Sequence, residues 1–247
     1  KLQNGQIASV ALMDARSIAA TAANKGYLTA ATDLDVEYTG STYHFDSNIY
    51  ANRVFDSHGV ADPNEEIHFG PNIKDWPEMP ALTDDLLVKV CSYITDPVTT
   101  TDELIPSGET SSLRSNPLKL AEFALSRKDP EYVGRAKDVF AFEKKREADP
   151  ADASVLQAVR KALAPLGKSD RALFDAICGG KDLAGTGIGS TIFAMKPGDG
   201  SAREQAASSQ KVLGGWANLA LEYATKRYRS NLINWGMLPF LCEPGIE

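Results

Sequence analysis

A polar stretch between an apolar run and an alanine-rich run has the residue types to hold an anion. It spans residues 196–207 and reads KPGDGSAREQAA. The run before it predicts a strand and the run after it a helix, whose first, unpaired N–H groups attract negative charge. Ser201 falls at the N-cap or in the first turn of this helix, and Arg203 just inside it can bind a carboxylate with two hydrogen bonds. A capping box between Ser201 and Glu204 fits the same residues, so the stretch alone leaves both interpretations open.

A second polar loop follows another expected strand. Residues 98–116, VTTTDELIPSGETSSLRSN, contain no long apolar run and place Asp102 and Arg114 among serines and threonines. The composition fits a turn-rich surface loop in which Asp102 bonds its own backbone. It fits equally a loop that carries one acid and one arginine to the edge of a sheet. Neither loop by itself shows whether these residues form a binding site or only a structural turn.

The elements around these loops predict an α/β fold with a central, mostly parallel sheet. Apolar runs suited to strands alternate with helix-forming runs over the C-terminal third, and this alternation is typical of parallel sheets. The expected strands are 86–94, 190–196, 216–224 and 237–241, and the expected helices between them are 201–213 and 225–236. Ligands of such sheets gather at the carboxyl ends of the strands, where both polar loops lie.

The N-terminal region predicts one helix and a long connection. Residues 7–25 carry apolar residues at helical spacing, which indicates a helix. Residues 38–80 are polar and rich in turn-forming residues, a composition typical of a linker. We therefore expect the packed domain to begin near residue 81.

The middle of the chain predicts mainly helices over residues 116–180. Asn116 before Pro117 suits an N-cap followed by proline at the first helical position, and Asp170 with Ser169 before it could cap a later helix. The charge run FEKKREADPAD, residues 142–152, is more typical of a solvated connection than of a site.

Composition excludes several classes of function. The 247 residues are 43% hydrophobic, enough for a substantial core, and no apolar run reaches the length of a membrane span. The net charge of −7 argues against nonspecific nucleic-acid binding. Cys91, Cys178 and Cys242 lie far apart without metal-ligand spacing, which fits buried reduced thiols in a cytoplasmic protein. The three histidines share one polar region without ligand partners and are interpreted as surface residues.

Taken together, the two loops resemble the C-terminal swivelling domain of the aconitase family, the iron–sulfur hydro-lyases. The family has a TTD loop followed by an arginine and later a G-x-G-S-S-R-E-H-A-A stretch ahead of L-G-G. TTTDELIPSG and GDGSAREQAASSQKVLGG match these in order, and RSNLINWGMLPF resembles the family's ETNLKKQGLLPL. Arg114 follows Asp102 by twelve residues, as the corresponding arginine does in aconitase.

The resemblance implies an organisation for the whole chain. Residues 1–80 would be the tail of a preceding catalytic domain plus the linker, and residues 81–247 the swivel domain, with a helical insertion at about 125–188. Residues 1–97 resemble the family only loosely. The implied partners are a small di- or tricarboxylic acid and cluster-bearing domains of the same full-length chain, with no nucleic acid and no membrane.

The resemblance also assigns roles to individual residues. Ser201 matches the serine that removes the proton next to a carboxylate, and Asp102 matches the loop aspartate of the site. Arg114 matches the arginine that binds a substrate carboxylate, and Arg203 the arginine of the serine loop. Ala202 stands where aconitase has a second serine that touches substrate, so the substrate identity rather than the reaction class is in doubt.

The resemblance predicts one domain of an aconitase-like hydratase acting on a citrate-like acid. The family's [4Fe–4S] cluster finds no matching cysteine pattern here, so the cluster is expected on N-terminal domains outside this chain, and the fragment alone is expected to be inactive. Two alternatives stay open: a non-catalytic anion-binding or regulatory module that keeps the swivel fold, and an RNA-binding role, which conflicts with the net charge.

Overall fold

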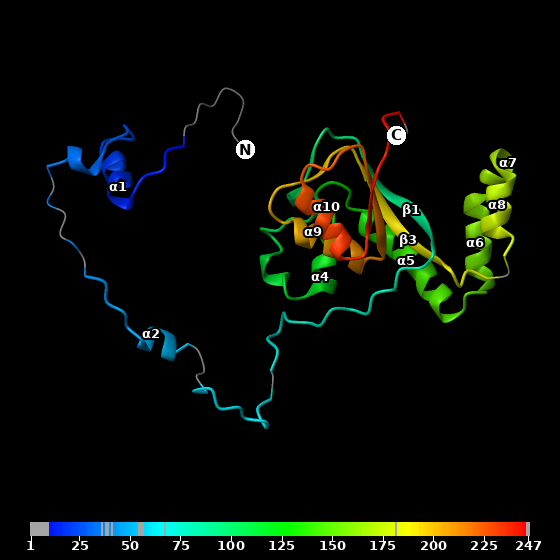
Figure 1. Ribbon diagram of the computed structural model, residues 1–247, viewed down its shortest axis with the longest axis horizontal. Helices are drawn as coiled ribbons and strands as arrows, with labels where there is room; N and C mark the ends of the chain where they lie inside the picture. The colour runs from blue at the N-terminus through cyan, green and yellow to red at the C-terminus, as the bar shows by residue number, and fades with distance from the viewer. Residues whose placement is uncertain are drawn as a thin grey trace. The chain divides into compact units, whose positions relative to one another are not determined.

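Four parallel strands form the central sheet, in the order β1-β3-β5-β6. The computed structural model in Figure 1 describes residues 10–35, 37, 40, 42–53, 57–66, 68–180 and 182–245. The strands are β1 (Asp85–Ile94), β3 (Thr186–Ala194), β5 (Gly215–Ala220) and β6 (Leu238–Leu241). Helices flank this sheet, so the α/β class and the parallel arrangement predicted from the sequence are confirmed.

Two strands differ in extent from the prediction. β3 begins at Thr186 and includes two glycines that the sequence places outside the strand. A Cβ at Gly189 would lie 1.8 Å from the ring of Trp216 on β5, so this strand position needs a glycine. β5 ends at Ala220 rather than at residue 224, because the chain then turns toward Thr225, whose side chain caps the next helix.

The chain divides into two units, residues 1–65 and 66–247. The first contains α1 (Ala15–Ala23), the 3-10 turn η1 (Ala31–Asp33) and α2 (Asn48–Ala51). The helix predicted over 7–25 is shorter, because the side chain of Asp14 accepts hydrogen bonds from the N–H groups of Arg16 and Ser17 and sets its start. Residues 7–9 lie outside the described residues.

Three helices of the second unit lie near the polar loops. They are α4 (Pro117–Ala121), α9 (Arg203–Val212) and α10 (Lys226–Asn234). The predicted N-cap Asn116 is confirmed, since its side chain accepts a hydrogen bond from the N–H of Lys119 at 3.1 Å. No helix among the described residues is long and apolar enough to cross a membrane.

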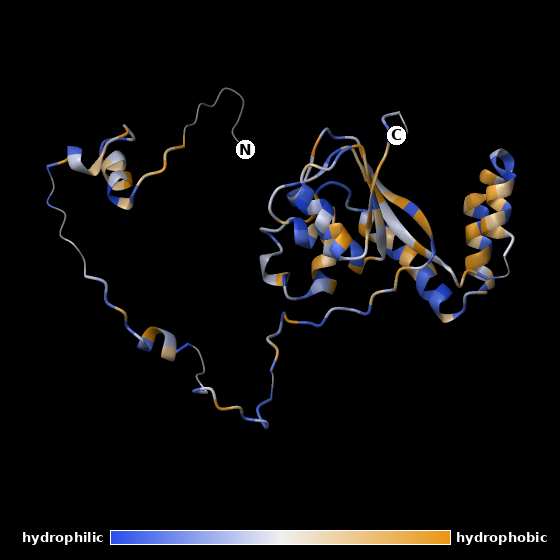
Figure 2. Cartoon of the chain, viewed as in Figure 1, coloured by the Kyte–Doolittle hydropathy of each residue, from blue (hydrophilic) through white to orange (hydrophobic). Residues whose placement is uncertain are grey.

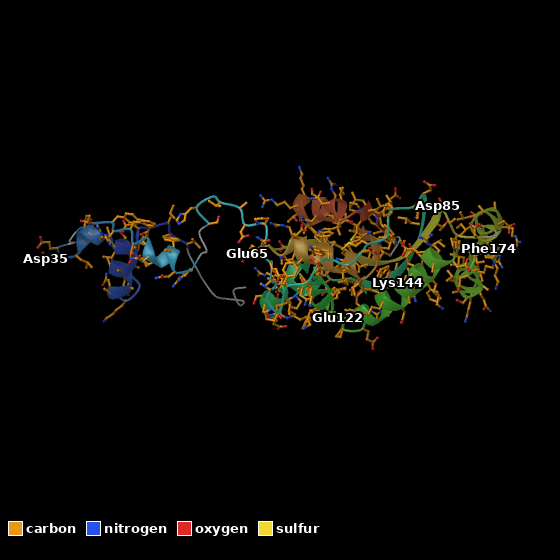
Figure 3. All side chains as sticks on the ribbon, turned by 90° about the horizontal axis from the view of Figure 1, so that it is seen from below. Asp35, Glu65, Asp85, Glu122, Lys144 and Phe174 are labelled. Atoms are coloured by element: carbon orange, nitrogen blue, oxygen red, sulfur yellow. The ribbon has the colours of Figure 1, made fainter. Side chains whose placement is uncertain are left out.

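The predicted helical middle is confirmed as four further helices. These are α5 (Tyr132–Ala148), α6 (Ala153–Leu163), α7 (Leu166–Ser169) and α8 (Arg171–Cys178). The predicted cap Asp170 accepts from the N–H of Leu173 at 2.9 Å. Hydrophobic residues run along α6 and α8 in Figure 2, and Figure 3 labels Lys144 on α5 and Phe174 on α8, so the segment can be followed outward from the sheet.

The interpretation of residues 142–152 as a solvated connection is wrong for the part up to Ala148, whereas residues 149–152 do connect α5 to α6. Residues up to Ala148 belong to α5, and Glu143 and Arg146 form an ion pair at 2.8 Å with only 0% and 6% of their surfaces exposed. Glu143 also accepts a hydrogen bond from the N–H of Ile188 at 2.7 Å, and Arg146 donates to the carbonyl of Leu183 at 3.2 Å. This pair therefore bonds α5 to the sheet.

Candidate active site

A two-stranded parallel sheet joins the two polar loops. Its strands are β2 (Thr99–Thr100), just after β1, and β4 (Pro197–Asp199), just after β3. The N–H of Thr99 donates to the carbonyl of Lys196 at 3.0 Å. Because β1 and β3 are adjacent and parallel, their carboxyl ends deliver both loops to the same edge of the main sheet. The structure thus brings together the two stretches that the sequence singles out.

One buried side chain locks the loops against each other. Thr101, 3% exposed, is the first residue of α3 (Thr101–Leu104), and its Oγ1 accepts a hydrogen bond from the N–H of Ala202 at 3.3 Å. A Cβ at Gly200 would lie 2.2 Å from the same oxygen, and the φ of Gly200 is +129°. Only glycine satisfies both the close approach and this backbone conformation. Thr101 and Gly200 together fix where the serine loop begins its helix.

A capping box exists at the site, but it lies in the first loop. The side chain of Thr100 accepts from the N–H of Glu103 at 3.3 Å, and Glu103 accepts from the N–H of Thr100 at 2.7 Å. Its T-x-x-E spacing was readable in TTTDE. The box sets the start of α3 and thereby the positions of Thr101 and Asp102.

The interpretation of Ser201 and Glu204 as a capping box is wrong. The N-cap of α9 is Ala202, and no side chain caps this end of the helix. Both carboxylate oxygens of Glu204 accept hydrogen bonds from α10 instead, from Asn231 and from Trp235. Ser201 is exposed, and its hydroxyl has no hydrogen bond to any residue in the described part of the chain.

The first turn of α9 presents free backbone donors beside Ser201. The first hydrogen bond of the helix runs from the N–H of Ala206 to the carbonyl of Ala202 at 3.0 Å, so the N–H groups of residues 203–205 have no partner within the helix. Arg203, partly buried, donates from Nη1 to the carbonyl of Gly200 and so closes the serine loop on itself. Ala202 is 8% exposed and packs in the core.

Asp102 has a counter-ion that the sequence analysis missed. Its carboxylate accepts from Arg127, which also binds Glu109, and both ion pairs are half exposed. The hydrogen bond that Arg127 donates to Glu109, together with the charge of Asp102, raises the pKa of the Arg127 guanidinium. Nothing in the local pattern around Arg127 indicates this role, because the pair joins segments 25 residues apart.

Arg114 is exposed just after the 3-10 turn η2 (Ser111–Leu113). Among the described residues it makes no ion pair or side-chain hydrogen bond, with the Ser201 loop or with any other segment. The backbone beside it is held in place, since the N–H of Lys74 donates to the carbonyl of Ser115 at 2.8 Å. The structure therefore leaves this guanidinium available without bringing it into contact with Ser201.

No group of three or more potential metal ligands occurs within the described ranges. The thiols of Cys91 and Cys178 are buried, and burial raises the pKa of each. A thiol must lose its proton to bind iron, so these residues do not fit the ligand set of an iron–sulfur cluster.

The fold and its edge loops define a parallel α/β domain with a serine at the start of a helix and arginines nearby. Residues 188–244 match the model of the aconitase C-terminal domain family. The matched segment begins within β3 and includes the serine loop, α9, β5, α10 and β6, so this part of the chain is similar to an aconitase C-terminal domain. No curated protein matches the chain.

Proposed function

We propose that this chain provides the substrate-binding and catalytic-serine domain of an aconitase-like hydratase. The reaction is the reversible dehydration and hydration of a citrate-like hydroxy polycarboxylic acid. One observation supports the proposal: Ser201 is exposed directly before the N-terminus of α9, whose first N–H groups have no partner within the helix, in a loop held by Thr101.

In this proposal Ser201, as the alkoxide, takes the proton from the carbon next to a substrate carboxylate. A serine hydroxyl is a poor base unless its alkoxide is stabilised. The free N–H groups and the positive end of α9 supply that stabilisation, with the guanidinium of Arg203 adjacent. The proton and the hydroxide that leaves the neighbouring carbon together form the water of dehydration. Arg114 binds a substrate carboxylate.

The proposal assigns the [4Fe–4S] cluster to other domains of the same full-length chain, because the described residues do not fit its ligands. Residues 1–80 as tail and linker, residues 81–247 as the swivel domain, and a cytoplasmic location remain parts of the proposal. The domain alone is expected to turn over no substrate.

Replacing Ser201 tests the proposal in the full-length enzyme. Ser201→Ala should lower the hydration rate of cis-aconitate at least about a thousandfold while the fold stays intact. Ser169→Ala is the matched control, since it removes a hydroxyl on α7 that donates only to backbone carbonyls, and it should leave the rate unchanged. A near-normal rate for Ser201→Ala, at an unchanged melting temperature, would contradict the proposal.

A non-catalytic anion-binding module is the second candidate. The ion pair between Asp102 and Arg127 favours it, because the loop aspartate is engaged in a contact within the domain rather than left open for a substrate. Calorimetry of the full-length protein with citrate and isocitrate separates the candidates. Binding without turnover in cluster-loaded protein indicates the module, whereas turnover indicates the hydratase.

A further inference from the structure

Two side chains of α10 and that of its C-cap residue, Trp235, form one row. Arg227, Asn231 and Trp235 are spaced by four residues, so they lie above one another on the same side of the helix. Two of them bind Glu204 in the first turn of α9: Asn231 donates to Oε2, and Trp235 donates to Oε1 at 2.6 Å. The row therefore faces the helix that follows Ser201, and Figure 1 shows α9 and α10 next to each other.

The first turn of α10 adjoins the strand that leads into the serine loop. Thr225 donates from Oγ1 to the carbonyl of Gly198 at 3.1 Å, and a Cβ at Gly198 would lie 2.4 Å from the ring of Tyr228. Gly198 thus lies next to Thr225 and Tyr228, two residues before and one residue after Arg227 in sequence, and Glu204 contacts the two residues above Arg227 in the row. Ser201 lies between Gly198 and Glu204 in the chain, so the serine loop runs along this side of α10.

Arg227 is the member of the row whose charge has no partner. It is exposed and makes no hydrogen bond or ion pair with the residues that the structure describes. Both oxygens of Glu204 are already bound by the other two members. Side chains of a helix lean toward its N-terminus, which for Arg227 is toward Gly198 and the serine loop.

The proposed substrate needs more than one guanidinium. A citrate-like acid carries several carboxylates, and Arg203 already donates to the carbonyl of its own loop. We infer that Arg227 is a further substrate-binding residue, which binds a second carboxylate of the acid held at Ser201. This inference rests on the proposed function and deepens it, because it makes Arg227 the residue that distinguishes tricarboxylates from dicarboxylates.

The test measures binding in the full-length protein carrying Ser201→Ala, so that it does not depend on turnover. Calorimetry with citrate and with malate is compared before and after Arg227→Ala. Loss of a charge-assisted pair should weaken citrate binding about ten- to a hundredfold and leave malate binding within about twofold. Arg227→Lys, which keeps the charge but not the two-pronged geometry, should recover part of the citrate affinity.

Arg229→Ala is the matched control, because Arg229 has the same charge and exposure on the same helix but lies off the row. It should leave both affinities unchanged. Unchanged citrate binding in Arg227→Ala, or an equal loss for citrate and malate, would overturn the inference. The proposed hydratase function would not be affected, because it is tested separately by the hydration rates of Ser201→Ala. An equal loss of citrate binding in Arg229→Ala would overturn the inference as well, since it would show that the general positive charge of α10, rather than a contact with Arg227, attracts citrate. If the Ser201→Ala parent binds neither acid, both proposals fail.

Discussion

The buried ion pair between Glu143 and Arg146 should couple the two residues far more strongly than a surface pair. Glu143→Gln keeps an oxygen to accept from Ile188 but leaves the Arg146 charge buried without its counter-ion. Removing one partner of such a pair costs about 3–5 kcal/mol, a large part of the about 5–15 kcal/mol that stabilises a typical domain. Arg146→Met should lower the free energy of unfolding by a similar amount, because it leaves the Glu143 carboxylate buried without a counter-ion.

The double variant Glu143→Gln/Arg146→Met carries no buried charge. Its main loss is the donor to the carbonyl of Leu183, which corresponds to about 1–3 kcal/mol. The double variant should therefore be more stable than either single variant, and the coupling energy of the cycle should exceed about 3 kcal/mol. Urea unfolding of all four proteins, followed by tryptophan fluorescence, measures this directly.

Arg171→Gln is the control, because it breaks an exposed pair with Asp175 on α8 and should cost less than about 0.5 kcal/mol. The reasoning is refuted if the two single changes in α5 each cost less than about 1 kcal/mol, or if their effects simply add. Either result would mean that water reaches the pair and screens it.

Further predictions concern the loop junction and a buried lysine. Thr101→Val should destabilise the protein by about 1–3 kcal/mol in urea unfolding, because the N–H of Ala202 loses its acceptor, whereas Thr101→Ser should cost less than about 1 kcal/mol. Gly200→Ala should cost more than Thr101→Ser, since its Cβ meets the Thr101 oxygen at 2.2 Å. Burial lowers the pKa of Lys211 to about 8 from 10.5, so the unfolded chain holds more protons between these values and stability should rise with pH from about 8 to 10.5. Lys211→Met should abolish this rise and increase the free energy of unfolding by about 1–3 kcal/mol at pH 7. The increase is limited because Nζ of Lys211 lies 3.6 Å from the Trp216 ring centroid, and the substitution loses this cation–π contact.

The strands of the main sheet and the longer helices were predictable in their order because they depend on local periodicity, whereas the short strands β2 and β4 inside the polar loops were not. The caps Asn116 and Asp170 were likewise readable, since a cap bonds to the backbone two or three residues on. The start of α9 could not be predicted, because the acceptor for the N–H of Ala202 belongs to Thr101, which lies 101 positions earlier in the chain. The sequence placed Ser201 at the N-cap or in the first turn, and the structure places it one residue before the N-cap Ala202, with no hydrogen bond from its hydroxyl to the described residues.

The partners of charged residues also could not be predicted, because they depend on contacts between distant segments. Glu143 and Arg146 look like any solvated pair in sequence, and only the packing of α5 on the sheet buries them. The counter-ion of Asp102 also comes from a distant turn. The two loops themselves were predicted as a pair from their resemblance to one family rather than from any physical contact readable in the chain.

The bond between Thr101 and Ala202 has a consequence for how freely the segment between them can vary. The chain leaves the site after residue 116 and returns on β3, and α5–α8 occupy the excursion. Doubling the length of a flexible connection costs only about 0.6 kcal/mol of closure entropy, so the loops between these helices can lengthen or shorten at little cost while the junction and the contacts of α5 with the sheet hold. A cut between α6 and α8 would leave each half with one loop of the site, and the halves should reassemble as a split protein through the β2–β4 pairing and the main sheet. The loops of the helical segment can therefore vary in length without touching Ser201, whereas α5 stays bonded to the sheet through Glu143 and Arg146.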